Sequence, residues 1–266
     1  MTQSLSPLCK TIFLALPLLL NGCFWHSYLP TKVENQIEKA YTNKTYWLKQ
    51  SLFTGPFYDD DRLRLADSKS FDSLDYLQTP DSEVILPPPS ELILPANTHI
   101  FIQKIEWPEF SQLLTRPLYT PRHYAWLFFK TNSHSSPIKL REDKSHIIVI
   151  PKQIQTAEDF SFWFDTLFSP QNLASWMSSL SPEEQKAIEK KLPVIGMSFD
   201  ALVATLGTPD SLRTLKPTAG NKQRREAAFF GKMVVYLEDG RVTQISQVKE
   251  VQQEELVPSF DDDFPD

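Results

Sequence analysis

The chain has 266 residues and a formal net charge of −6, and 41% of its residues are hydrophobic and 12% aromatic. This composition is that of a globular protein of one large or two small domains, and the acidic balance argues against nucleic acid as a partner and against polybasic binding to anionic lipid. Glycine is scarce (7) and proline frequent (21), so a glycine-rich phosphate loop is not expected.

The first element in the chain is a short apolar run over residues 11–23, which ends in Leu20-Asn21-Gly22-Cys23. The run is shorter than the about 20 apolar residues that a membrane-spanning helix needs, and it has the size of a signal-peptide core. An ordinary cleaved secretory signal and a buried apolar segment are the alternatives.

The end of this run resembles the lipobox of bacterial lipoproteins, in which a Leu and two small or uncharged residues precede an invariant Cys. The resemblance implies that residues 1–22 are a signal peptide and that Cys23 carries lipid as the first residue of the mature chain. Phe24 stands where lipoproteins held in the inner membrane carry Asp, which favours the periplasmic face of the outer membrane. Cys9 would leave with the signal peptide, so the mature domain would contain no disulfide and no thiolate metal site.

Residues 23–91 are expected to form a lipid-anchored N-terminal helix, starting at Thr31, and a connector rich in proline and acid. The connector contains an acidic run at 59–61 and three prolines at 87–89, which favour an extended, stiff segment. A ligand for a proline-binding module and a calcium-binding turn are the functional alternatives. The spacing and glycine of an EF-hand loop are missing, so a solvated acidic turn is favoured.

Residues 92–151 are predicted to form an antiparallel β unit. Residues 99–107 alternate between two faces, residues 124–129 and 147–150 are apolar on both faces, and prolines fall between these runs. Short strands of this kind favour a small closed barrel or a sandwich. The stretch from Ile93 to Ile105 resembles the opening of small bacterial Src-homology-type barrels.

Residues 152–192 are predicted to form a pair of helices. Thr156 can cap the first helix, and Ser181 followed by proline begins the second. Trp163 and Trp176 belong to an aromatic set that either lines a ligand groove or, as is more common for such residues, belongs to the core.

Residues 193–250 have the order of a short helix followed by a β hairpin. Ser198 can cap the helix, Gly207 and Pro209 end it, and Asp239-Gly240 makes a tight turn between two strands. Residues 251–266 form an acidic tail that is predicted to be disordered.

This order resembles the domain of the BamE/SmpA outer-membrane lipoproteins. Those proteins show a Gly-Met-(Ser/Thr) start, a Leu-Gly-x-Pro helix end and a Tyr-x-x-x-Asp-Gly hairpin, which appear here at residues 196–198, 206–209 and 236–240. The resemblance implies an α+β fold and a role in protein–protein contact, and it carries over no site residues.

No motif in the sequence indicates a particular enzymatic reaction. The five histidines lack the spacing of an H-E-x-x-H motif, His99 and His146 are expected at surface or edge positions, and no G-x-S-x-G elbow is present. We therefore expect no catalytic residue, cofactor or metal. Lys222, Arg224 and Arg225 form a basic loop that is either solvated or in contact with an anionic partner.

The sequence thus predicts an α+β envelope lipoprotein with a central barrel-like β unit, a helical pair and a BamE-like C-terminal domain. Its expected role is that of a non-enzymatic scaffold or protein-binding module for another envelope protein. A binding module for peptidoglycan, glycan or lipid is the alternative, and an envelope hydrolase has the least support. Residues that could contact a partner are Trp163, Trp176, Lys222, Arg224 and Arg225.

Overall fold

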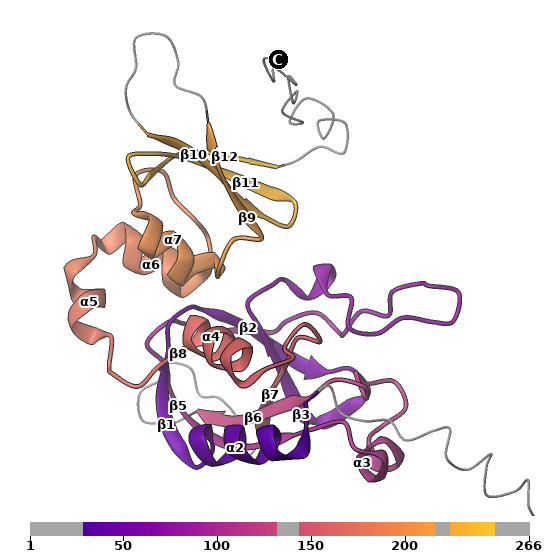
Figure 1. Ribbon diagram of the computed structural model, residues 1–266. Helices are drawn as coiled ribbons and strands as arrows, with labels where there is room; N and C mark the ends of the chain where they lie inside the picture. The colour runs from indigo at the N-terminus through magenta and orange to yellow at the C-terminus, as the bar shows by residue number, and fades with distance from the viewer. Residues whose placement is uncertain (1–28, 132–143, 216–223, 248–266) are drawn as a thin grey trace, which may run out of the picture.

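The computed structural model describes residues 29–131, 144–215 and 224–247, which fold into two β sheets flanked by helices (Figure 1). The larger sheet contains β1 (Lys44–Leu48), β2 (Leu52–Phe57), β3 (Asp60–Asp67), β4 (Leu92–Leu94), β5 (His99–Glu106), β6 (Trp126–Thr131), β7 (Ser145–Val149) and β8 (Phe168–Ser169). Its helices are α2 (Thr31–Tyr41), α3 (Phe110–Thr115) and α4 (Ala157–Leu167), with a short 3-10 helix, η2 (Phe71–Ser73). We call residues 29–169 the large-sheet unit.

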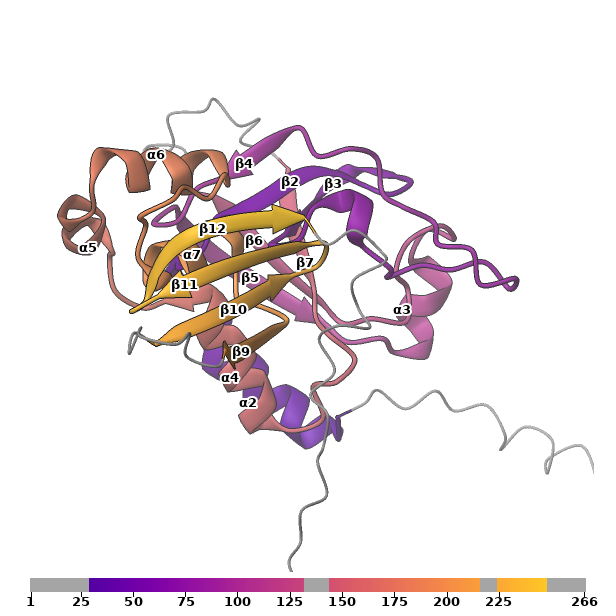
Figure 2. The ribbon, with the colours of Figure 1, turned by 90° about the horizontal axis from the view of Figure 1, so that it is seen from above.

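The smaller sheet contains β9 (Ser211–Leu215), β10 (Arg225–Phe230), β11 (Met233–Glu238) and β12 (Arg241–Gln247), in the order β12-β11-β10-β9. Three helices precede it in the chain: α5 (Ala174–Ser179), α6 (Pro182–Lys190) and α7 (Phe199–Leu206). We call residues 174–247 the small-sheet unit. In the view from above, the small sheet lies over the large one, with α5 and α6 to one side and α3 to the other (Figure 2). The described chain is therefore α+β, as predicted.

The large sheet is open and mixed. Its strands follow the order β4-β2-β3-β7-β6-β5-β1-β8, and the pair β3–β7 is parallel. The closed antiparallel barrel predicted for residues 92–151 is therefore wrong. The physical reason is that strands from residues 44–67 flank the set from both sides, β1 against β5 and β3 against β7, so this set has no free edge with which to close on itself.

Residues 23–91 differ most from the prediction. Helix α2 begins at Thr31 as predicted, but residues 44–67 then form β1 to β3 where a helix end and a stiff connector are expected. The acidic run lies at the turn between β2 and β3, and Asp60 in it is buried. Its carboxylate accepts hydrogen bonds from the backbone N–H and the guanidinium of Arg62, which hold the pKa of Asp60 below its usual value. The acidic turn was predicted to be solvated, but Asp60 is buried and its carboxylate pairs with Arg62.

The local signals at helix ends are confirmed. Thr156 caps α4 in a capping box, since its hydroxyl accepts the Asp159 N–H (3.0 Å) and the Asp159 carboxylate accepts the Thr156 N–H (3.0 Å). Ser181 forms the same arrangement with Glu184 at the start of α6. The predicted helical pair contains the additional short helix α5 between these two helices.

Three apolar clusters make up the core. One packs α2 and α4 on one face of the large sheet, around Ile37, Phe160 and Phe164. A second lies around Phe57 and Trp126, against residues of the segment that follows β3. The third packs α6 and α7 on the small sheet. Each sheet therefore has its own core, and the two units meet at a separate boundary.

Candidate functional site

Ser51, in the link between β1 and β2, joins the two units. Its backbone N–H donates to the carbonyl of Ala204 in α7 (2.8 Å), and its hydroxyl donates to the carbonyl of Ile188 in α6 (2.7 Å). The same hydroxyl accepts the N–H of Ala96 (3.0 Å). Ser51 is fully buried, so water could not replace these bonds. We call the boundary around Ser51 the seam.

Lys191 places a cation in the seam. It caps α6 in the left-handed conformation, with φ at 51°, and it is only 4% exposed. Its Nζ donates to the carbonyls of Ser51 (2.7 Å) and Thr205 (2.9 Å) and lies 5.0 Å from the centre of the Phe53 ring. Burial lowers the pKa of Lys191 to about 7, and the negative charge of Asp67 partly opposes this effect. Because its nitrogen is held by a carbonyl from each unit, Lys191 ties the units together.

Asp67, at the end of β3, is the acidic group whose charge raises the pKa of Lys191. Its carboxylate accepts hydrogen bonds from the hydroxyl of Tyr76 (2.5 Å) and from the backbone N–H of Lys69 (2.8 Å). Burial raises the pKa of Asp67, although these bonds and the charges of Lys69 and Lys191 act in the opposite direction. Burial also raises the pKa of Tyr76. The seam thus contains titratable groups that are shielded from water.

An open cleft of about 550 Å³ lies beside the seam. Its lining comes from both units and consists of Phe53, Ser68, Lys69, Ser70, Asp72, Ser73, Lys191, Leu206, Thr208, Asp210, Phe230, Gly231, Lys232, Met233 and Gln247. Lys69 of the large-sheet unit forms an ion pair with Asp210 of the small-sheet unit, at 3.1 Å between Nζ and Oδ1. The cleft is therefore built by the docking of the two units and belongs to neither alone.

The cleft combines apolar and basic groups. Phe53, Leu206, Phe230 and Met233 give it apolar surface, and its exposed cations are Lys69 and Lys232, since Lys191 is buried. Its volume is within the usual range for ligand sites. The described lining contains no histidine, and it offers no hydroxyl activated by one. Such a surface suits a ligand with apolar parts and acidic groups.

Gly207 allows the units to approach closely at the edge of this cleft. Its φ is 98°, a conformation that L side chains rarely adopt, and a Cβ built there would lie 2.4 Å from Oε1 of Gln50 and 3.2 Å from Cβ of Ser68. Gln50 is buried, so its side chain has little room to retreat. The sequence predicts Gly207 as a helix end, and the structure adds a contact between units at the same residue.

His146 is not at the surface or edge position predicted for it. It is 1% exposed in the middle of the large sheet, where its ring stacks on Phe129 with 5.1 Å between ring centres. Neither ring nitrogen has a hydrogen-bond partner among the described residues, and burial, followed by the charge of Arg64, lowers the pKa of His146 to about 3. His146 is thus a neutral core residue without access to a substrate.

The structure does not bring the predicted contact residues together. Trp163 packs against the core of the large-sheet unit and Trp176 against that of the small-sheet unit. Arg224 forms an ion pair with Glu226 (2.7 Å), and Arg225 one with Glu238 (3.3 Å). Cys23, Lys222 and the tail at 251–266 lie outside the described residues.

The sequence does not predict the residues that line the cleft, because no local pattern distinguishes them from other residues. Lys191 follows Lys190 at the end of a helix, where basic residues are common because they complement the helix dipole. Only the docking of the units buries one lysine and leaves the other exposed. The pattern in the sequence is the same for both.

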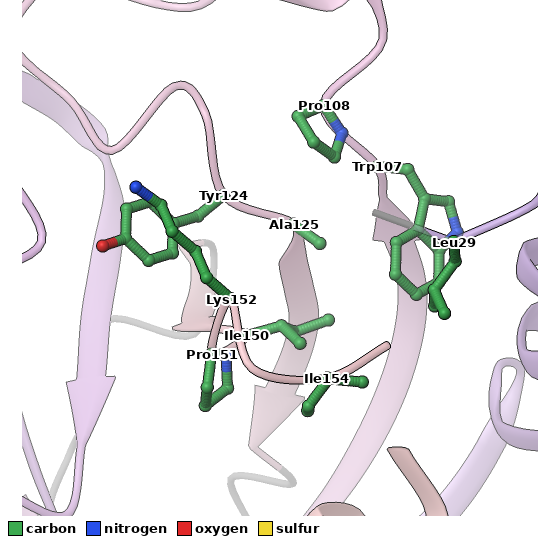
Figure 3. A pocket seen from close by; sticks show the side chains of 9 residues that line it. All are labelled: Leu29, Trp107, Pro108, Tyr124, Ala125, Ile150, Pro151, Lys152 and Ile154. Atoms are coloured by element: carbon green, nitrogen blue, oxygen red, sulfur yellow. The ribbon is translucent and has the colours of Figure 1, made fainter. Parts of the chain in front are cut away.

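A second, much smaller pocket of about 10 Å³ lies where the described chain begins. Figure 3 shows Leu29 beside Trp107 and Pro108 on one side of it, and Tyr124 and Lys152 on the other. Leu29, one of the residues that line it, is 3% exposed. A space of this size holds about one water molecule at most and has no room for a larger ligand.

Within the described ranges, no group of three or more His, Cys, Asp or Glu side chains could hold a metal ion. None of the helices in this part of the chain is long and apolar enough to cross a membrane. No family model, no curated protein and no solved structure matches the chain.

Proposed function

We propose that this chain is an envelope lipoprotein, anchored through lipid on Cys23 at the periplasmic face of the outer membrane, and that it acts as a non-enzymatic protein-binding module. The observation that carries the binding role is the cleft of about 550 Å³ that both units line. The lipobox at residues 20–23 supports the anchor.

The chemistry of the cleft suggests a polypeptide segment as the ligand. Apolar side chains of such a segment would pack on Phe53 and Phe230, and its acidic side chains would pair with Lys232 and Lys69. A ligand that displaced Asp210 from Lys69 would replace one ion pair by another, at little cost, because both partners are substantially exposed. The described residues of the cleft therefore favour an acidic, partly aromatic segment of another envelope protein.

The C-terminal order of elements supports the same class of function. In the small-sheet unit, α7 is followed by antiparallel strands with a tight turn at Asp239-Gly240, both in the left-handed region. This agrees with the resemblance to BamE-type domains in element order. A glycan-binding groove formed by Trp163 and Trp176 is less favoured, because these side chains pack on different cores.

The test of the anchor is the intact mass of the protein from the membrane fraction, measured beside Cys23→Ala. We expect a mass equal to residues 23–266 plus acyl chains, which the variant lacks. An unlipidated mass would contradict the anchor.

The test of the cleft is site-specific photo-crosslinking in cells. A benzoylphenylalanine placed at Phe230 in the cleft is compared with one at Phe162, which is 76% exposed on α4 and does not line the cleft. We expect a protein adduct from position 230 that Lys232→Glu reduces several-fold, and none from position 162. Equal adducts from both positions would contradict a site in the cleft, and sedimentation of the protein with isolated peptidoglycan would support the alternative.

A further inference from the structure

An apolar surface protrudes from the large-sheet unit at α3 and the turn after it. Leu114 is 69% exposed, Leu118 66% and Tyr119 55%. These three residues lie within six positions of the chain, and we call them the α3 patch. Single exposed apolar residues are ordinary, but a cluster of large ones marks a contact surface.

The backbone under the α3 patch is held firmly in place. Arg116, which is 6% exposed, donates from Nη1 to the carbonyls of Arg122 and Tyr124 (both 2.8 Å) and from Nη2 to the carbonyl of Glu106 (3.1 Å). Its guanidinium carbon lies 3.7 Å from the centre of the Trp126 ring. These bonds anchor the backbone at Arg116, which lies between Leu114 and Leu118 in the chain.

The α3 patch lies at the corner where the chain arrives from Cys23. Leu29 contacts the same small pocket as Pro108, which is two residues before α3, and Tyr124, whose carbonyl Arg116 holds (Figure 3). Leu29 is six positions after Cys23, and an extended chain of that length spans at most about 20 Å. A lipid on Cys23 would therefore keep this corner within that distance of the bilayer.

We propose that the α3 patch inserts into the interfacial layer of the bilayer to which Cys23 is anchored. This inference rests on the lipid anchor of the proposed function. Two leucines and a tyrosine suit this layer, because the aliphatic groups leave water while the phenol reaches the headgroups. In Figure 1, α3 and the small sheet lie at opposite ends of the molecule, so this contact would direct the small-sheet unit away from the membrane.

The experiment measures backbone hydrogen exchange on vesicles. Residues 23–266, which include every described residue, have Cys23 as their one thiol and are coupled through it to a maleimide lipid in phosphatidylcholine vesicles. This coupling supplies the tether whether or not cells lipidate Cys23, so a failure here is distinct from a failure of the proposed anchor. The reference is the same protein with capped Cys23 in solution.

We expect exchange at residues 110–119 to slow on the order of tenfold on vesicles. The variant Leu114→Ser, Leu118→Ser, Tyr119→Ser should lose this slowing and keep the core exchange pattern of the folded protein. As the matched control, Leu192→Ser with Ile195→Ser removes two side chains that are 61% and 71% exposed on the link between α6 and α7, and it should keep the slowing.

Unchanged exchange at residues 110–119 would overturn the proposal. Slowing at residues 192–195 instead would assign the membrane contact to another face and also overturn it. Slowing at 110–119 that appears in solution and grows with protein concentration would assign the α3 patch to self-association rather than to lipid.

Discussion

At the scale of single residues, the polar groups in the seam are buried and each has defined hydrogen-bond partners. Ser51 and Lys191 satisfy carbonyls from both units where no water is available. A buried cation is costly, and its retention is explained here by the two carbonyls that it pairs with. Asp67, which is buried and linked to Tyr76, lowers the cost further through its charge.

Lys191 makes a prediction about pH. Its pKa in the folded protein is about 7, against 10.5 for an exposed lysine, so the unfolded chain holds this proton more tightly. The contribution of Lys191 to the free energy of unfolding is therefore greatest above about pH 10.5. It falls as the pH falls to about 7, by up to about 1.4 kcal/mol per pH unit. Urea unfolding of wild type and Lys191→Met is measured from pH 6.5 to 10. The free energy of unfolding of wild type should rise relative to that of the variant as the pH rises.

The matched control for this measurement is Lys190→Met, because Lys190 is the exposed neighbour of Lys191. Its stability difference from wild type should not depend on pH in this range. A difference between wild type and Lys191→Met that is constant across the range would show that the folded protein does not lower the pKa of Lys191.

At the scale of elements, helix ends follow from local chemistry and strand pairing does not. Thr156, Ser181 and Ser198 cap helices where the sequence predicts them, because a cap involves only the next three residues. Tyr46 and Trp47 continue the partly helical apolar pattern that begins at Val33, so the sequence favours a helix at residues 44–48. They form β1 because β5 and β8 lie on its two sides.

The capping box of α4 makes a prediction at this scale. Thr156→Ala removes the acceptor for the Asp159 N–H, so we expect the free energy of unfolding to fall by about 1 kcal/mol. Thr156→Ser retains the hydroxyl and should stay close to wild type. The measurement is urea unfolding followed by tryptophan fluorescence, and equal losses in both variants would show that the hydroxyl does not act as a cap.

At the scale of the whole molecule, the function proposed for the cleft depends on how the two units dock. Each unit has its own core, and they are joined by the hydrogen bonds of Ser51 and Lys191 and by the ion pair of Lys69 with Asp210. A change at the seam should therefore alter the cleft while leaving both cores intact.

Gly207→Ala tests this docking. The added methyl group would lie 2.4 Å from Oε1 of Gln50 in a backbone conformation unsuited to alanine, so we expect a loss of about 1–3 kcal/mol and faster hydrogen exchange at the seam. Gly231→Ala is the matched control, because its φ is also positive, at 57°, but nothing lies within 4 Å of the added atom. Losses of equal size in the two variants would contradict a tight contact between the units at Gly207.

The sequence by itself determined what depends on neighbouring residues. It predicted the start of α2, the caps of α4, α6 and α7, the turn at Asp239-Gly240, and the strands β5, β6, β7, β11 and β12 to within a few residues. Capping bonds, turn conformations and side-chain alternation act over one to four positions, so they can be read without knowing the fold.

Only the tertiary structure decided which segments meet. It placed β1 to β3 in the large sheet, buried His146 and Lys191, and formed the cleft from residues 53–73 and 191–247. These features depend on contacts between segments that are distant in the chain, such as β3 with β7 and Ser51 with Ile188, and no local pattern records such a contact. The candidate site was therefore absent from the sequence prediction, although α7, β11 and β12, which carry part of it, were predicted.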